Sequence, residues 1–153
     1  MKNYFLIIGS IVLLCIGCGK SYMIDEEVAF ETKQWAQDET LDFIISVTDT
    51  SKRYNIYLEI DHSKMYIYQN IYMNVHTKYP SGKSLKQQLN VDLAELDGKW
   101  KGICKGEDCK AQIVLQENAY FNELGTHTFG FEQFTRDIKL SGMNGISFKV
   151  EEH

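Results

Sequence analysis

The chain has 153 residues, of which 44% are apolar and 24% are charged, and its formal net charge is −5. This balance is typical of one soluble globular domain, and the single Pro and 11 Gly exclude collagen-like and Pro-rich chains. The acidic charge argues against a nucleic-acid partner, because phosphate binding requires clustered Lys and Arg.

The first 17 residues read as a secretory signal. A basic start at Lys2 is followed by an almost wholly apolar run over residues 4–16. At about 1.5 Å per residue this run cannot cross a hydrocarbon core of roughly 30 Å. The pattern is that of the n-region and h-region of a signal peptide, and it predicts removal of residues 1–17.

Cys18 is the predicted lipidation site. The small residue Gly17 precedes it and closes the apolar run, as in a lipobox. Acyl chains on Cys18 would hold the mature chain on a membrane, with residues 18–24 as a short tether. Cys15 is a weaker candidate because the bulky Leu14 precedes it. A plain signal peptide and an N-terminal anchor helix are the alternatives.

Two cysteines remain in the mature chain. Cys104 and Cys109 flank a polar segment containing Gly106, which predicts a turn between two strands. An even number of cysteines in an oxidising compartment favours a disulfide across this turn. Two free thiols or half of a metal site are the alternatives, although a zinc site would need two further ligands.

From residue 40 onward the apolar residues alternate with period two. Leu41, Phe43, Ile45 and Val47 share one face, and the segment 53–61 repeats the pattern after a polar turn at 49–52, which predicts a hairpin. Further runs follow over 66–76, 85–93, 113–115, 129–131 and 146–150, with a short helix or irregular corner over 134–140. We expect a single all-β domain over 25–153, an antiparallel β-sandwich of roughly eight short strands, either Ig-like or jelly-roll-like.

The polar face of the third run is the candidate binding surface. Rings and amides alternate with the apolar positions there, and they belong to Tyr66, Tyr68, Asn70, Tyr72 and Asn74. Aromatic rings stack and amides donate and accept hydrogen bonds, so such a face suits a glycan or a partner protein. Tyr57 would join it if the second and third runs pair. The alternative is ordinary packing of tyrosines across strands.

No motif of catalysis is present in the sequence. A nucleophile elbow, a phosphate-binding loop, a dinucleotide fingerprint and a zinc-protease motif are all missing, and the four His residues show no paired spacing. We therefore expect no catalytic residues, no metal and no cofactor.

The order of several short motifs resembles the GldH family of gliding-motility lipoproteins of Bacteroidota. The segments that carry the resemblance are Trp35, Asp38-Glu-Thr-Leu-Asp-Phe43, Asp49-Thr50, Tyr54-Asn-Ile-Tyr57, Tyr66, Asn70-Ile-Tyr72, Leu89 to Leu93, Asp97-Gly-Lys-Trp-Lys-Gly102, Phe121-x-x-x-Gly125-Thr126, Phe131-Glu-Gln133 and Leu140-x-Gly-x-x-Gly145-Ile146. Together with the lipobox they cover nearly the whole mature chain. The Cys104 and Cys109 pair stands out as an addition.

The resemblance implies an outer-membrane lipoprotein without catalytic activity. Its partners would be the membrane, through the lipid anchor, and other envelope proteins of the gliding and type IX secretion apparatus. Whether it faces the periplasm or the cell surface stays open, because the acidic run 25–27 starts too far from Cys18 to act as a clear surface signal.

Overall fold

The computed structural model describes residues 20–153, and the signal segment and Cys18 lie outside the described residues. Eleven β-strands form this part of the chain: β1 (Tyr22–Ala29), β2 (Gln34–Ala36), β3 (Thr40–Val47), β4 (Tyr54–Ser63), β5 (Asn70–Lys78), β6 (Ser84–Asp92), β7 (Ile103–Lys105), β8 (Asp108–Ala119), β9 (Gly125–Gln133), β10 (Lys139–Ser141) and β11 (Met143–Glu152). Within residues 20–153, no helix has the length and apolar character needed to cross a membrane.

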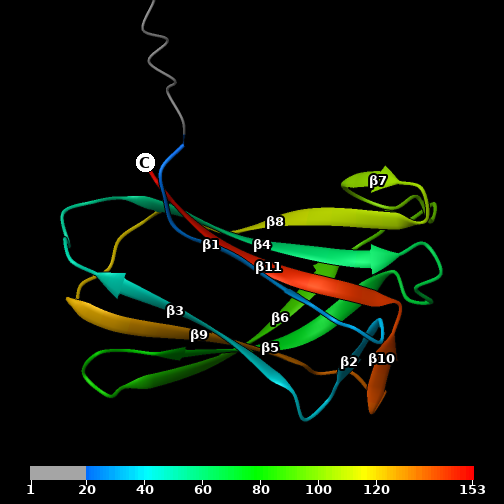
Figure 1. Ribbon diagram of the computed structural model, residues 1–153, viewed down its shortest axis with the longest axis horizontal. Helices are drawn as coiled ribbons and strands as arrows, with labels where there is room; N and C mark the ends of the chain where they lie inside the picture. The colour runs from blue at the N-terminus through cyan, green and yellow to red at the C-terminus, as the bar shows by residue number, and fades with distance from the viewer. Residues whose placement is uncertain (1–19) are drawn as a thin grey trace, which may run out of the picture.

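The strands form two antiparallel layers that face each other (Figure 1). One sheet has the order β1-β11-β4-β8-β7, the other has the order β3-β9-β5-β6, and β2 pairs with β10 at one end. When β2, β7 and β10 are set aside, eight long strands remain. Their order is first, eighth, third, sixth in one sheet and second, seventh, fourth, fifth in the other, which is the jelly-roll arrangement. The all-β sandwich is confirmed, and of the two topologies left open it is the jelly-roll-like one.

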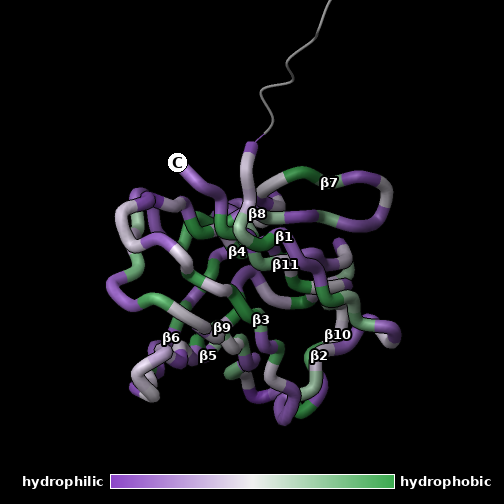
Figure 2. Tube along the Cα trace, turned by 60° about the vertical axis from the view of Figure 1, so that its left-hand side comes forward, coloured by the Kyte–Doolittle hydropathy of each residue, from purple (hydrophilic) through white to green (hydrophobic). Residues whose placement is uncertain are grey.

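The core lies between the layers and follows from the alternation of the sequence. β3 and β4 alternate strictly between buried and more exposed positions, because successive side chains on a strand point to opposite faces. In Figure 2 the hydrophobic stretches run along strands of both sheets and most loops are hydrophilic. The largest fully buried side chains are Trp35, Phe43, Ile45, Tyr54, Leu58, Ile60, Ile71, Met73, Leu93, Phe131, Leu140 and Phe148.

The predicted hairpin of the first two runs is wrong. β3 pairs with β9, while β4 pairs with β11 and β8, so the two strands belong to different sheets. The segment between them crosses from one layer to the other, and Asp49 accepts hydrogen bonds from the backbone N–H (2.8 Å) and the hydroxyl (2.7 Å) of Ser51 there. A polar turn between two alternating strands fits either a hairpin or a crossing between layers, because both leave one face of each strand buried. Tyr57 therefore does not join the β5 face.

Two predicted boundaries also shift. β5 begins at Asn70 rather than at residue 66, so Tyr66 lies in the preceding loop and its side chain is buried, whereas Ile67 is 79% exposed. At the N-terminus, β1 begins at Tyr22, inside the segment 18–24 that we expected to be a tether. Pairing with β11 explains this, since Tyr22 is opposite Glu151 in the register.

The two ends of the sandwich differ in what they carry. The tether end holds the start of β1, the end of β11, and the loops over 48–53 and 120–124 (Figure 1). The distal end holds the loops over 64–69, 93–102 and 134–138. These names are kept below.

Candidate functional site

The five residues of the predicted binding face separate into three exposed or half-exposed residues and two buried ones. Tyr72 and Tyr68 are 44% and 39% exposed, and Asn70 is half-buried. Tyr66 is buried, and its hydroxyl donates a hydrogen bond to the carbonyl of Asn70 (3.0 Å). Asn74 is also buried, and its amide donates to Glu132 Oε2 (3.3 Å).

Tyr66 belongs to the distal end of the core rather than to a recognition surface. Its ring lies 5.8 Å from that of His62 and 6.4 Å from that of Trp100. Burial raises the pKa of its hydroxyl, because the phenolate form would lose its hydration. For Tyr66 the structure therefore agrees with the packing alternative.

A groove at the distal end joins the remaining residues to a loop far away in the sequence. Its volume is about 650 Å³, and it is lined by Tyr68, Asn70, Tyr72, Gln88, Phe134, Thr135 and Arg136. Phe134 is 51% exposed, so three aromatic side chains reach solvent around one hollow. Its size is within the range of sites that take small organic ligands.

The segment 134–138 is fixed by a buried glutamine. Gln133, which is fully buried, accepts hydrogen bonds at Oε1 from the backbone N–H of Thr135 (2.9 Å) and from its hydroxyl (2.7 Å). Its Nε2 donates to the carbonyl of Asp137 (2.8 Å), and the Phe134 N–H donates to the carbonyl of Tyr72 (2.8 Å). Gln133 thus holds the corner together with Gln37, whose side chain donates to the carbonyl of Thr135 (3.1 Å) and whose N–H donates to the carbonyl of Ile138 (2.8 Å), and the groove wall is preformed.

Hydrogen bonds also orient the other wall. The Tyr68 hydroxyl donates to Asp137 Oδ2 (2.9 Å), and this bond raises the pKa of Tyr68, because it favours the protonated phenol beside a carboxylate. The amide of Asn70 donates to Asn90 Oδ1 on β6 (2.7 Å). Both side chains are therefore held in place before any ligand arrives.

The outer face of β5 continues into a polar cluster. His76 Nε2 lies 2.8 Å from Glu132 Oε2, and Lys86 Nζ lies 3.6 Å from the same oxygen. The hydrogen bond with His76, followed by that with Asn74, lowers the pKa of Glu132. The neighbours of this carboxylate therefore join β5, β6 and β9 across the outer face of the sheet.

Sequence reasoning did not find Phe134, Thr135 and Arg136. Their distance from β5 in the sequence hides the contact, which arises from the pairing of β9 with β5. The signal in the sequence was the presence of Phe134 and Arg136 in the segment 134–140, which was predicted to be a short helix or irregular corner.

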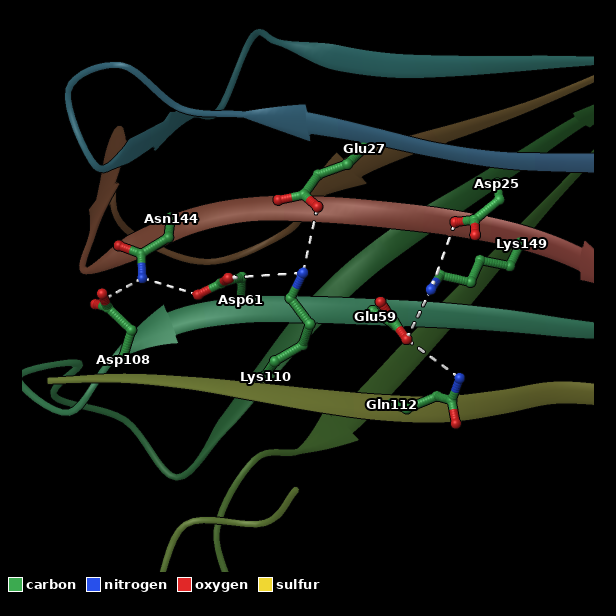
Figure 3. Close-up of polar contacts among 9 residues, drawn as sticks. All are labelled: Asp25, Glu27, Glu59, Asp61, Asp108, Lys110, Gln112, Asn144 and Lys149. Atoms are coloured by element: carbon green, nitrogen blue, oxygen red, sulfur yellow. Dashed lines mark hydrogen bonds and ion pairs between the residues drawn. The ribbon is translucent and has the colours of Figure 1, made fainter. Parts of the chain in front are cut away.

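The outer face of the other sheet carries rows of paired charges rather than an open site (Figure 3). Lys149 on β11 lies 3.4 Å from Asp25 and 3.1 Å from Glu59. Lys110 on β8 lies 3.2 Å from Glu27, and 3.8 Å from Asp61. Three of these pairs join neighbouring strands, as expected of cross-strand pairs, whereas the pair of Lys110 on β8 with Glu27 on β1 reaches across β4 and β11.

Asn144 completes the second row. Its amide donates to Asp61 Oδ1 and to Asp108 Oδ1, both at 2.8 Å (Figure 3). Each of these carboxylates has a nearby cation or amide donor. Within residues 20–153, no group of three or more His, Cys, Asp or Glu side chains has a metal-binding arrangement.

The disulfide between Cys104 and Cys109 is confirmed. The two residues are direct partners across the β7–β8 hairpin, with their Cα atoms 4.0 Å apart. All three residues of β7 are exposed, so the bond fastens a strand that buries little surface.

Comparison with known proteins decides the family. The model of the GldH lipoprotein family matches residues 22–150, which is nearly the whole described domain. The chain belongs to the GldH lipoprotein family. It is therefore a lipoprotein, anchored to a membrane.

Two curated relatives align along almost their full length. The chain is 26% identical to a gliding motility lipoprotein GldH homolog of Christiangramia forsetii, over 98% of this chain and 95% of that protein. It is 23% identical to the gliding motility lipoprotein GldH of Flavobacterium johnsoniae, over 99% of this chain and 98% of that protein. Both alignments extend over the signal segment and Cys18 as well as the sandwich, because so little of the chain is left out.

Proposed function

We propose that this chain is a non-enzymatic outer-membrane lipoprotein and an accessory component of the gliding motility and type IX secretion machinery of the cell envelope. Cys18 carries the lipid, and the sandwich presents a binding surface to other envelope proteins. The observation that carries the proposal is the near full-length match to two gliding motility lipoproteins.

The organisation of the chain supports this role. A lipobox-like sequence precedes a single folded domain that begins at Tyr22. One of its surface features is a preformed groove with aromatic walls, which suits recognition.

The test is a deletion strain of the host combined with purification of the native protein from membranes. We expect the deletion to impair colony spreading or type IX secretion, and we expect the wild-type gene to restore it. The protein should co-purify with envelope proteins. Normal motility and secretion in the deletion strain, together with recovery of the protein without a stable partner, would contradict the proposal.

Glycan binding is the second candidate function, and the groove favours it. Tyr68, Tyr72 and Phe134 offer ring faces for stacking on sugars, and Asn70 and Gln88 offer amides for their hydroxyl groups. The same features fit a peptide side chain, so the distinction needs a binding experiment.

A screen of envelope and dietary glycans against the full-length protein would decide between them. Tyr72→Ala should abolish a genuine signal, whereas Tyr120→Ala, which removes an exposed tyrosine at the tether end, should leave it unchanged. A glycan that binds both variants equally well does not use the groove.

A further inference from the structure

The folded domain starts very close to the proposed lipid anchor. β1 begins at Tyr22, only four residues after Cys18. A fully extended chain covers at most ~3.3–3.6 Å per residue, so Tyr22 lies within roughly 14 Å of the lipid-bearing residue. This step rests on the proposed lipidation of Cys18, and it means that the tether end of the sandwich is held next to the lipid headgroups.

The tether end exposes apolar and aromatic side chains, and it is the proximity to Cys18 that sets them apart from the exposed apolar side chains of the distal end. Tyr22 is 38% exposed, and Tyr120 and Leu124, in the loop after β8, are 58% and 61% exposed. The register places this loop beside the termini, because Ala119 is opposite Tyr54 and Tyr54 is opposite Glu152. Figure 1 shows the start of β1, the chain end and the segment between β8 and β9 at one end of the molecule.

A cation accompanies these rings. The guanidinium of Arg53 lies 4.7 Å from the centre of the Tyr120 ring. Tyrosine is enriched at membrane interfaces, where its ring contacts the acyl boundary and its hydroxyl stays in water. Arginine can likewise bury its methylene stem while its charge stays among the headgroups.

The carboxylates at this end have partners within the domain. Glu151 lies 2.9 Å from Lys20 Nζ, and Glu152 lies 2.7 Å from Lys52 Nζ. Glu123 accepts hydrogen bonds from the N–H and the hydroxyl of Ser81. Two of the carboxylates at the tether end are thus paired with lysines, and Glu123 and Asp49 are held by serine hydrogen bonds, so the attraction to lipid would come from apolar and aromatic contact rather than from net charge.

We propose that Tyr22, Arg53, Tyr120 and Leu124 form a membrane-contact surface on which the sandwich rests when Cys18 is lipidated. The partner of this surface is the lipid bilayer itself. β4 runs between the two ends over ten residues, or roughly 30 Å at about 3.3 Å per residue. The aromatic groove at the distal end is then held well away from the lipid, where it is open to other envelope components.

The test uses the lipidated full-length protein in vesicles of phosphatidylethanolamine and phosphatidylcholine. Leu124→Cys is labelled with an environment-sensitive fluorophore, and lipids with nitroxide groups near the headgroup act as quenchers. Ile138→Cys is the matched control, because Ile138 is 75% exposed and lies at the distal end. With Cys104 and Cys109 bonded and Cys18 blocked by lipid, only the introduced thiol reacts.

We expect the label at position 124 to be quenched several-fold more strongly than the label at position 138, and we expect this difference to persist at high salt. Equal quenching at both positions, or none at position 124, in protein that floats with the vesicles would overturn the membrane-contact surface while the anchor stands. Protein that does not float, or whose Cys18 also takes the label, would instead contradict the lipid anchor on which the inference rests.

Discussion

Adjacent residues on β5 have opposite roles, because the strand alternates between the core and the groove. Ile71 is fully buried, and Tyr72 is 44% exposed in the groove. Ile71→Ala should lower the free energy of unfolding by about 2–5 kcal/mol, since it leaves a cavity in the core. Tyr72→Ala should change it by only about 0.5 kcal/mol, as surface substitutions usually do. Urea denaturation of both variants measures these changes. A Tyr72→Ala variant that is unfolded would show that the Tyr72 ring is part of the core.

His62 gives the domain a predictable response to acid. It is fully buried between the rings of Tyr66 and Trp100, with Nδ1 3.0 Å from the carbonyl of Ser63. Burial lowers the pKa of His62, so the unfolded chain takes up this proton more readily than the folded chain. Stability is therefore complete above the ordinary histidine pKa of about 6.5 and falls as the pH drops below it, by no more than about 1.4 kcal/mol per pH unit.

Denaturation of the wild type and of His62→Leu at pH 7.5, 6 and 5 measures this effect. The wild type should lose stability over this range, and the variant should lose less. The lowered pKa of Glu132 affects stability at lower pH, because the contribution of Glu132 is lost only as the pH falls below the ordinary glutamate range. Parallel pH profiles for the two proteins would show that another group is responsible.

At the scale of an element, the corner over 134–138 depends on Gln133. Gln133→Met keeps the side-chain length but leaves the Thr135 N–H and the Asp137 carbonyl without this partner. We expect a loss of about 1 kcal/mol, the lower end of the range for unsatisfied polar groups, because Thr135 and Asp137 are half-buried. Gln87→Met, at an exposed position of β6, is the control. If both variants unfold at the same urea concentration, the glutamine does not hold the corner.

The β7–β8 hairpin should depend on its disulfide locally rather than globally. The closed loop is short, and the chain-entropy model gives about 2 kcal/mol for it. Cys104→Ala with Cys109→Ala should therefore lower the melting temperature by several degrees, at about 2–4 °C per kcal/mol for a domain near this size. Hydrogen exchange should speed up in β7 and stay slow in β4. Loss of the whole fold on reduction is the result that does not fit.

The positions of the strands in this fold are easier to predict from the sequence than the pairing between strands. Alternation predicts most of β3 and β4, because a half-buried strand leaves a pattern of period two in its own residues. Which strand lies beside which is a long-range property, so the pairing of β3 with β9 was missed. The same holds for the groove. Its wall along β5 and the loop before it follows from Tyr68, Asn70 and Tyr72 in the sequence, whereas its wall at Phe134 depends on the register between β5 and β9.

In the whole molecule, the proposed membrane-contact surface and the proposed recognition groove lie at opposite ends of the sandwich. The tether end carries the start of β1, and the distal end carries the aromatic groove. The jelly-roll order places both termini of the described chain at one end, so in the proposed arrangement lipid on Cys18 keeps that end nearest to the membrane.

Fractionation of cells that carry Cys18→Ala shows whether acyl chains on Cys18 hold this domain on the outer membrane. The wild type should sediment with the outer membrane, and its mature N-terminal peptide should carry the mass of the lipid. The variant should be released from that fraction or mislocalised, because a 13-residue apolar run cannot replace acyl chains as a stable span. A Cys18→Ala protein that remains in the outer-membrane fraction without lipid would contradict the account.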